Sequence, residues 1–261
     1  MTEGALLLEA VTDVAREAGR TALASFRAGL AVEWKADGSP VTAADRSAEA
    51  VARAWIGARF PEDGIVGEEE GAFNEPAERR WFIDPIDGTN AFIQGVPLWG
   101  TLVAVARGDE VLAGAAFFPV LDEMLCAAPG LGCWWNGSRS WASGTDDLSR
   151  ATVLTTDDRF TAAPDRVRGW RALSARARLS RTWGDCYGYL LVATGRAEVM
   201  VDPVMSAWDA AALQPAIIEA GGIFTDWDGN ATAFGGSVVA TNAALGDSAR
   251  ALLRDGAAGS A

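Results

Sequence analysis

A short apolar run that ends in two aspartates constrains this chain more than any other feature. Residues 79–95 read RRWFIDPIDGTNAFIQG, so Asp84 and Asp87 follow the apolar run Trp81–Ile83 and precede a Gly-Thr-Asn turn. The run predicts a buried strand. Carboxylates at the end of such a strand are costly to desolvate without a positive partner. The rest of the chain must supply that partner or make it unnecessary.

Two further acids, Glu68 and Asp209, stand in similar local contexts, at a strand end or in the first turn of a helix. The run Ile65–Val66 predicts a short strand just before Glu68. If it pairs with the strand that precedes Asp84, the two carboxylates converge. Convergent oxygens suit Mg²⁺, and pairs of such ions hydrolyse phosphate esters in many enzymes. The pattern therefore indicates a metal-dependent phosphatase site.

Each of these acids also has an ordinary structural interpretation. Asp87 precedes a glycine, which is a common turn dipeptide, and Glu68 fits a solvated loop. Asp209 and Asp45 each stand three residues after a serine or threonine, which is the spacing of a helix capping box. No single residue decides between the alternatives. The joint pattern favours a metal site, because the ordinary interpretations would all have to coincide.

Composition restricts the chemistry further. The chain of 261 residues has a formal net charge of −13 and no histidine. Nucleic-acid binders usually carry the opposite sign, so we expect no nucleic-acid partner. Without histidine, Ser-His-Asp and Cys-His catalysis and histidine-ligated zinc are excluded. A hydrolytic site must use carboxylates, hydroxyls, backbone N–H groups and hard metal ions.

Cysteine use and hydropathy bear on the compartment. Three cysteines without paired spacing favour a reducing environment. No apolar run approaches the roughly 18 residues of a membrane span, and the acidic N-terminal stretch lacks the basic region of a secretory signal. We expect a cytoplasmic protein that does not bind a membrane.

The chain predicts an α+β layered architecture, because helical and strand patterns alternate without a linker or repeat. Residues 98–136 predict an antiparallel meander. We expect one domain over 1–261 with two sub-halves: about 1–150, with the metal and phosphate site, and 151–261, with Asp209 and substrate selectivity. Helices are predicted over 3–28, 43–59, 165–177, 184–194, 207–220 and about 243–254.

Three motifs resemble the signatures of the inositol monophosphatase superfamily: GEEE at 67–70, DPIDGTNAF at 84–92 and WDAAALQPAIIEAGG at 208–222. They occur in the same order, and the resemblance extends from WKADGSPVTAAD at 34–45 to the GG-x-F sequence at 221–224. It implies a layered αβαβα sandwich of the inositol monophosphatase and fructose bisphosphatase type. It also implies a Mg²⁺-dependent, lithium-sensitive phosphomonoesterase that is commonly a homodimer.

The resemblance implies specific ligands for two or three Mg²⁺ ions. Glu68, Asp84 and the carbonyl of Ile86 would hold the first ion. Asp84, Asp87 and Asp209 would hold the second. A third, weaker ion would lie near Glu68.

The resemblance also implies where the phosphate and the attacking water lie. Asp87 and the backbone N–H groups of Gly88 and Thr89 would surround the phosphate at a helix N-terminus, which suits an anion. Thr89 and Asp45 would orient the attacking water, and Glu68 would assist them.

Substrate selectivity is expected in the second half. Inositol-selective members usually have small residues after Gly184, where this chain has Asp185, a cysteine and Tyr187. This segment resembles the histidinol-phosphate phosphatase branch. Histidinol phosphate carries an ammonium group and an imidazole. Asp185 and Asp202 would bind the cations, and Trp183 or Tyr187 would stack on the ring.

Alternatives remain open from the sequence. The aromatic side chains of Trp183 and Tyr187 could equally be core packing, and Asp185 a helix N-cap. An inositol-1-phosphate or broad-specificity sugar-phosphate phosphatase would share every catalytic residue. A non-enzymatic acidic metal-binding module is the more remote alternative.

Overall fold

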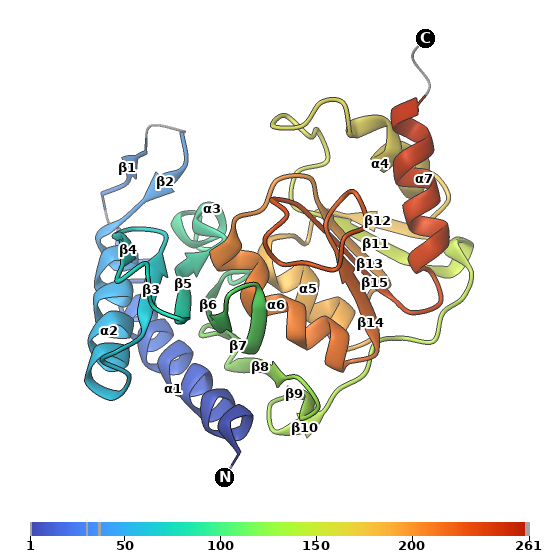
Figure 1. Cartoon of the computed structure of the whole chain (residues 1–261). Coiled ribbons are helices and arrows are strands. Elements are labelled where there is room, and N and C mark those ends of the chain that lie inside the picture. Colours follow the sequence, from blue (N-terminus) through green and yellow to red (C-terminus); the bar gives the residue numbers. More distant parts are fainter. Residues whose placement is uncertain (1, 30, 36–37, 259–261) are drawn as a thin grey trace.

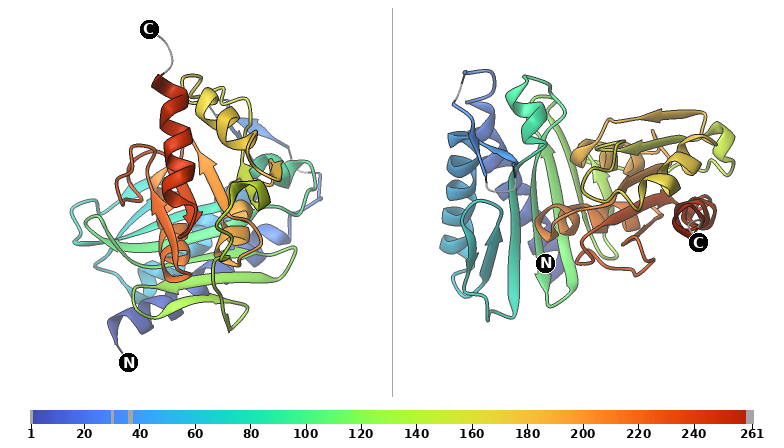
Figure 2. Two further views of the ribbon diagram at one scale, coloured as in Figure 1. Left: turned by 90° about the vertical axis from the view of Figure 1, so that its right-hand side faces the viewer. Right: turned by 90° about the horizontal axis from the view of Figure 1, so that it is seen from above.

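The computed structural model describes residues 2–29, 31–35 and 38–258 and alternates helices and sheets in the order α, β, α, β, α (Figure 1). Seen from above, the N-terminal helices cover the outer face of the larger sheet (Figure 2). Helices α5 (Asp185–Ala193) and α6 (Ala207–Glu219) lie between the two sheets, and α4 (Val167–Ser174) and α7 (Gly246–Ala258) cover the far side of the smaller one. The predicted layered sandwich is confirmed.

The larger sheet has eight strands in the order β10-β9-β8-β7-β6-β5-β3-β4. Its described pairs are antiparallel except β3 with β5, which run parallel. The meander predicted over 98–136 is confirmed as β6 to β9. The strands are β3 (Gly64–Gly67), β4 (Gly71–Phe73), β5 (Arg79–Asp87), β6 (Gly100–Arg107), β7 (Glu110–Phe118), β8 (Glu123–Ala128), β9 (Gly132–Trp135) and β10 (Ser138–Arg139).

The smaller sheet has five strands in the order β12-β11-β13-β15-β14. Strands β12, β11 and β13 are parallel, β15 runs antiparallel to β13, and the edge strand β14 runs antiparallel to β15. A separate two-stranded ribbon pairs β1 with β2. The strands are β1 (Glu33–Trp34), β2 (Pro40–Val41), β11 (Thr152–Thr155), β12 (Leu179–Arg181), β13 (Val199–Asp202), β14 (Gly222–Thr225) and β15 (Val238–Asn242).

The predicted helices all form, with shifted ends. Helix α1 (Glu3–Leu23) ends before the predicted residue 28, and Arg27, four residues past its end, takes a left-handed φ of 61° that no helix continues through. Helix α2 (Ala43–Arg59) has the predicted bounds, and α4 is shorter than 165–177. Sequence patterns did not predict α3 (Thr89–Ile93) as a separate element, nor the 3₁₀ turn Leu148–Arg150.

Strand β5 positions the site because both of its faces are buried. Trp81 and Ile83 pack into the core beneath α1 and α2, and Phe82 packs into the core between the sheets. A strand covered on both sides has a continuous apolar sequence, which explains why this run lacks alternation. The core between the sheets includes residues from both predicted sub-halves, such as Leu102 and Leu213. The division near residue 150 stays a prediction.

Two further properties of the described residues concern membrane-spanning helices and the cysteines. Across the described residues, no helix combines the length and the hydropathy needed to cross a membrane. The three cysteines are free thiols: Cys133 and Cys186 are buried and Cys126 is half-buried.

Candidate active site

Three carboxylates converge where β5 ends and α6 begins. Asp84, Asp87 and Asp209 each offer an oxygen, and these oxygens lie within 4.8 Å of one another. We call these residues the carboxylate trio. The structure thus joins two acids of one motif to a third that lies in the second half of the chain.

A β-bulge makes the convergence of Asp84 and Asp87 possible. Against β6, Asp84 pairs with Leu102 and Asp87 with Gly100, so β5 contains one extra residue in this interval. In a regular strand, residues three apart point to opposite faces. The extra residue brings both carboxylates to the same side. The bulge also corrects the expectation that the strand ends before Asp84, since β5 continues through Asp87.

Backbone N–H groups hold two members of the trio. The Oδ1 atom of Asp84 accepts a hydrogen bond from the backbone N–H of Ile86 at 2.9 Å. The Oδ2 atom of Asp87 accepts one from the backbone N–H of Cys186, at the start of α5. The backbone of Cys186 therefore connects the second half of the chain to Asp87. The residue type of Cys186 did not indicate this role, because the backbone N–H makes the hydrogen bond.

Asp209 has the capping role considered for it from the sequence, and its second carboxylate oxygen leaves the metal role open. Its Oδ2 atom accepts from the backbone N–H of Ser206 at 3.2 Å, as in a capping box. Its Oδ1 atom is buried and has no hydrogen-bond partner among the described residues. A buried acceptor without a partner is costly. This orphaned oxygen within the trio fits a bound cation.

The electrostatics of the trio favour the same conclusion. Burial raises the pKa of Asp87 to about 8 and of Asp209 to about 7, and repulsion between neighbouring carboxylates adds to it. Burial also raises the pKa of Asp84 well above its usual range, reinforced by Glu68 and the other two acids. No ion pair among the described residues involves the trio. A dication with oxygen ligands, such as Mg²⁺, fits this donor set.

Glu68 lies beside the trio but is paired with a lysine. It follows β3, and its backbone N–H donates to the carbonyl of Ile83 at 3.1 Å, next to Asp84. Its Oε1 atom accepts from Lys35 Nζ at 2.8 Å, and the same ammonium donates to Glu69 at 2.7 Å. Burial opposes the charge of Lys35, but these hydrogen bonds outweigh it and raise its pKa. The sequence did not reveal this pairing.

The structure does not join Thr89 to Asp45. Asp45 is 1% exposed and accepts from the backbone N–H of Thr42 at 2.8 Å and from its hydroxyl at 2.6 Å, as a capping box for α2. The hydroxyl of Thr89 donates to the carbonyl of Ile86 at 3.0 Å instead. Burial is the main cause of the raised pKa of Asp45, and repulsion from the carboxylate of Glu68 adds to it. The carboxylates of Asp45 and Glu68 therefore face the same part of the site. Their role with water stays a prediction.

The turn after Asp87 requires glycine. Gly88 has φ of 86° and precedes α3 as its N-cap. A Cβ atom there would lie 3.1 Å from the carbonyl oxygen of Leu98 and 3.2 Å from Oδ2 of Asp185. The close approach places the carboxylate of Asp185 against the turn whose N–H groups were expected to hold phosphate.

Asp185 and Asp202 differ in what they are free to bind. Asp202 is 6% exposed, and its oxygens accept from the backbone N–H of Thr156 at 3.1 Å and from the hydroxyl of Tyr189 at 2.8 Å. The backbone N–H of Asp185 donates to the hydroxyl of Thr156 at 2.9 Å. Asp202 thus supports the segment that carries Asp185. Burial, then the charges of Asp87 and Asp202, raise the pKa of Asp185 well above its usual range.

The alternatives for the substrate-side residues are partly resolved. Gly184, not Asp185, is the N-cap of α5, so the N-cap interpretation of Asp185 is wrong. Trp183 is 42% exposed, so it is not core packing. Tyr187 is half-buried and meets Phe118 edge to face, with ring centroids 5.4 Å apart. Its ring therefore packs against the core between the sheets.

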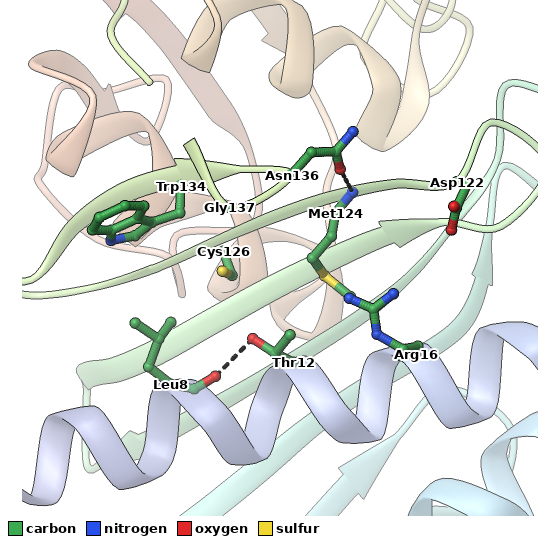
Figure 3. A pocket seen from close by; sticks show the side chains of 9 residues that line it. All are labelled: Leu8, Thr12, Arg16, Asp122, Met124, Cys126, Trp134, Asn136 and Gly137. Carbon is green, nitrogen blue, oxygen red and sulfur yellow. Dashed lines mark hydrogen bonds between the residues drawn. The ribbon is translucent and has the colours of Figure 1, made fainter. Parts of the chain in front are cut away.

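A pocket of about 600 Å³ lies elsewhere, between α1 and strands β8 and β9 (Figure 3). None of the predicted site residues lines it. Side chains from the helix and from the sheet face one another across it, and its lining contains one acid. The lining residues are Leu8, Thr12, Arg16, Asp122, Met124, Cys126, Trp134, Asn136 and Gly137.

The chain belongs to the inositol monophosphatase family, whose model matches residues 5–256. A histidinol-phosphatase from Chlorobaculum parvum is 41% identical over 251 residues, 95% of this chain and 97% of the relative. A histidinol-phosphatase from Mycobacterium tuberculosis is 35% identical over 256 residues, 96% and 98% of the two chains. The solved structure of an inositol monophosphatase from Zymomonas mobilis superposes with a TM-score of 0.86 and 31% identity, covering 97% of this chain and 100% of its own.

Proposed function

We propose that this chain is a Mg²⁺-dependent phosphomonoesterase that hydrolyses histidinol phosphate to histidinol and phosphate. The observation that carries the metal-dependent part is the carboxylate trio with the orphaned Oδ1 atom of Asp209. One buried and two half-buried acids with raised pKa values, and with no ion-pair partner among the described residues, are a costly arrangement for folding alone. A site built for dications explains it.

The residues that would hold the ions are those implied by the motifs. Asp84, Asp87 and Asp209 would hold one Mg²⁺, and Glu68, Asp84 and the Ile86 carbonyl another, with a third near Glu68. Bound Mg²⁺ supplies charge neutralisation at the phosphate and leaving oxygen and lowers the pKa of water. Li⁺ is expected to inhibit by competing for these oxygens.

The chain's own groups would bind and orient the reactants. Backbone N–H groups of Gly88 and Thr89 would donate to phosphate oxygens at the start of α3. Thr89, after releasing the Ile86 carbonyl, would orient the attacking water together with Asp45, and Glu68 would assist. The water oxygen bonds to phosphorus, the bond from phosphorus to the ester oxygen breaks, and the alcohol leaves with a proton.

The substrate assignment rests on the second half of the chain. The relatives named for histidinol phosphate are 41% and 35% identical to this chain. Asp185 brings a carboxylate to within reach of the phosphate turn, where an ester's organic group would extend. Histidinol phosphate has an ammonium group that such a carboxylate can bind. Trp183, exposed beside it, would stack on the imidazole.

Inositol 1-phosphate is the second candidate substrate. The Zymomonas mobilis inositol monophosphatase covers 97% of this chain at 31% identity, and a broad sugar-phosphate specificity would use the same trio. Tyr187 packs on Phe118 and adds nothing that distinguishes the two esters.

A side-by-side assay tests the proposal. The values of kcat/KM for histidinol phosphate and inositol 1-phosphate are compared with Mg²⁺ and after chelation with EDTA. We expect Mg²⁺-dependent turnover and at least a tenfold preference for histidinol phosphate. A preference for inositol 1-phosphate would overturn the substrate. Phosphate release that persists in EDTA, or none with any ester, would overturn the metal-dependent phosphatase. The homodimer implied by the resemblance is tested separately by light scattering.

A further inference from the structure

The loop that carries Glu68 is anchored from beneath by a buried glutamate of α2. Glu49 is 0% exposed. Its Oε2 atom accepts from the backbone N–H of Glu69 at 2.8 Å, and its Oε1 atom from that of Glu70 at 3.0 Å. Both carboxylate oxygens are therefore occupied by the backbone of the segment that follows β3.

Arg53 completes the anchor. Its Nε atom donates to Oε1 of Glu49 at 2.8 Å, and its Nη2 atom donates to the carbonyl of Gly71. Glu49 and Arg53 lie one turn apart on α2. Glu49 contacts the middle of the loop, at Glu69 and Glu70, and Arg53 contacts its end at Gly71. The guanidinium group of Arg53 therefore compensates the buried negative charge of Glu49.

Gly67, where the loop begins, lies directly against the carboxylate of Glu49. A Cβ atom on Gly67 would lie 2.1 Å from Oε1 of Glu49 and 2.8 Å from Nη2 of Arg53. Any side chain there would push the carboxylate away from the loop. Gly67 is thus required by the close approach of the two segments.

A carboxylate is needed at this position, and an amide is not equivalent. Three N–H donors converge on Glu49, which accepts at both oxygens. Glutamine has one oxygen and one NH₂ group, so in either orientation its NH₂ would meet an N–H donor. The arrangement is specific for an ionised glutamate.

We propose that Glu49 is a positioning residue that holds the Glu68 loop in the geometry for metal binding. The inference rests on the proposed function, in which Glu68 binds a metal ion. Glu49 does not touch the substrate or the ion. It acts through the backbone of Glu69 and Glu70, which immediately follows Glu68. Groups that orient metal ligands typically change metal affinity about 10- to 100-fold when removed.

The test measures Mn²⁺ binding to the full chain by electron paramagnetic resonance without substrate, and the Mg²⁺ dependence of kcat. In Glu49→Gln we expect the affinity of one bound Mn²⁺ to fall about 10- to 100-fold. The ion at the carboxylate trio is retained, and the half-saturating Mg²⁺ concentration rises in parallel. Unchanged Mn²⁺ affinities would overturn the proposal.

Glu198→Gln is the matched control. Glu198 is also buried, and it accepts from the backbone N–H of Thr152 at 2.6 Å and from the hydroxyl of Ser143 at 2.9 Å, in the second half of the chain. We expect this variant to lower the melting temperature without changing Mn²⁺ affinity. An equal loss of Mn²⁺ affinity in Glu198→Gln would show that general destabilisation causes it, which would overturn the positioning role.

Gly67→Ala gives an independent route that does not depend on the folding of Glu49→Gln. Its methyl group displaces the Glu49 carboxylate, so we expect the same loss of Mn²⁺ affinity. Normal affinity in a folded Gly67→Ala protein contradicts the proposal. A wild-type chain that binds no Mn²⁺ at all would instead refute the proposed function, which separates the two failures.

Discussion

Two acidic regions of the same site differ in what compensates their charge. The carboxylate trio has raised pKa values, and no lysine or arginine of the described residues forms an ion pair with it. The neighbouring loop has protein cations: Lys35 binds Glu68 and Glu69, and Arg53 binds Glu49. In the proposed function the trio would therefore depend on an external cation, whereas the loop is held in place by the protein itself.

This contrast assigns different tasks to the two regions. In the proposed function the trio would supply the main binding energy for a metal ion, because no cation among the described residues relieves its repulsion. The loop would supply the carboxylate of Glu68, and a metal ion there would have to displace the ammonium group of Lys35. Metal binding at Glu68 is accordingly expected to be the weaker of the two.

The largest effect is expected from Asp84→Asn. Asp84 is shared between both proposed ions, so kcat should fall by about 10³-fold or more, roughly 4 kcal/mol of transition-state stabilisation. The melting temperature of the metal-free protein should rise, since a repelling charge is lost. Steady-state kinetics and thermal unfolding measure both.

Asp63→Asn is the control for this variant. Asp63 is also buried and accepts from Arg79 and from the indole N–H of Trp81, both at 2.7 Å, away from the trio. Folded Asp63→Asn should keep its turnover. If Asp84→Asn retains more than about a tenth of wild-type kcat, a loss under 1.4 kcal/mol, the shared-ligand role is wrong.

The next effect concerns substrate choice at Asp185. A charge-assisted hydrogen bond contributes about 1.5–3 kcal/mol, so Asp185→Asn should lower kcat/KM for histidinol phosphate roughly 10- to 150-fold. Hydrolysis of glycerol 2-phosphate should not fall, because its alcohol has no cation. Asp202→Asn, which loses internal hydrogen bonds, should lower both activities alike. Equal losses on both esters in Asp185→Asn would make Asp185 a structural residue.

Lys35→Gln is expected to strengthen metal binding, whereas the preceding variants weaken activity, and its effect is smaller. Removing the ammonium frees Glu68 for a metal ion, so the half-saturating Mg²⁺ concentration should fall roughly 3- to 10-fold. Arg46→Gln removes a more exposed ion pair, with Glu33 at 2.6 Å, and should have no such effect. A rise in the Mg²⁺ requirement of Lys35→Gln would show that the lysine supports the metal site instead of competing with it.

The last predicted effect is on stability and not on turnover: the melting temperature of the metal-free protein depends on pH. The pKa is about 8 for Asp87 and about 7 for Asp209 in the fold, against about 3.9 in an unfolded chain. Between about pH 4 and 8 the native state binds more protons, so stability decreases as pH rises. Melting temperatures should fall from pH 5 to 8, and saturating Mg²⁺ should remove the slope. A metal-free melting temperature that rises over this range would contradict the raised pKa values.

Local patterns predicted a large part of the molecule. The apolar run before Asp84, the turn residues of the meander and the capping positions before Asp45 and Asp209 act over a few residues, so their elements follow from the sequence. The metal-site prediction required the motifs together, because each acid alone has an ordinary explanation.

The remaining features depend on contacts between distant segments. The bulge in β5 sets which face Asp87 takes, and it is defined only by pairing with β6. The hydrogen bonds that the backbone N–H groups of Glu69 and Glu70 donate to Glu49 join residues twenty and twenty-one positions apart. The approach of Asp185 to Gly88 requires both sheets to be in place. Residue type and spacing carry no direct sign of these contacts.

Crystals grown with Mn²⁺ and phosphate would show whether the carboxylate trio binds a metal ion. We expect an anomalous scattering peak bound by Asp84, Asp87 and Asp209, with phosphate at the N–H groups of Gly88 and Thr89. Crystals at saturating Mn²⁺ with no peak among these three carboxylates would contradict it.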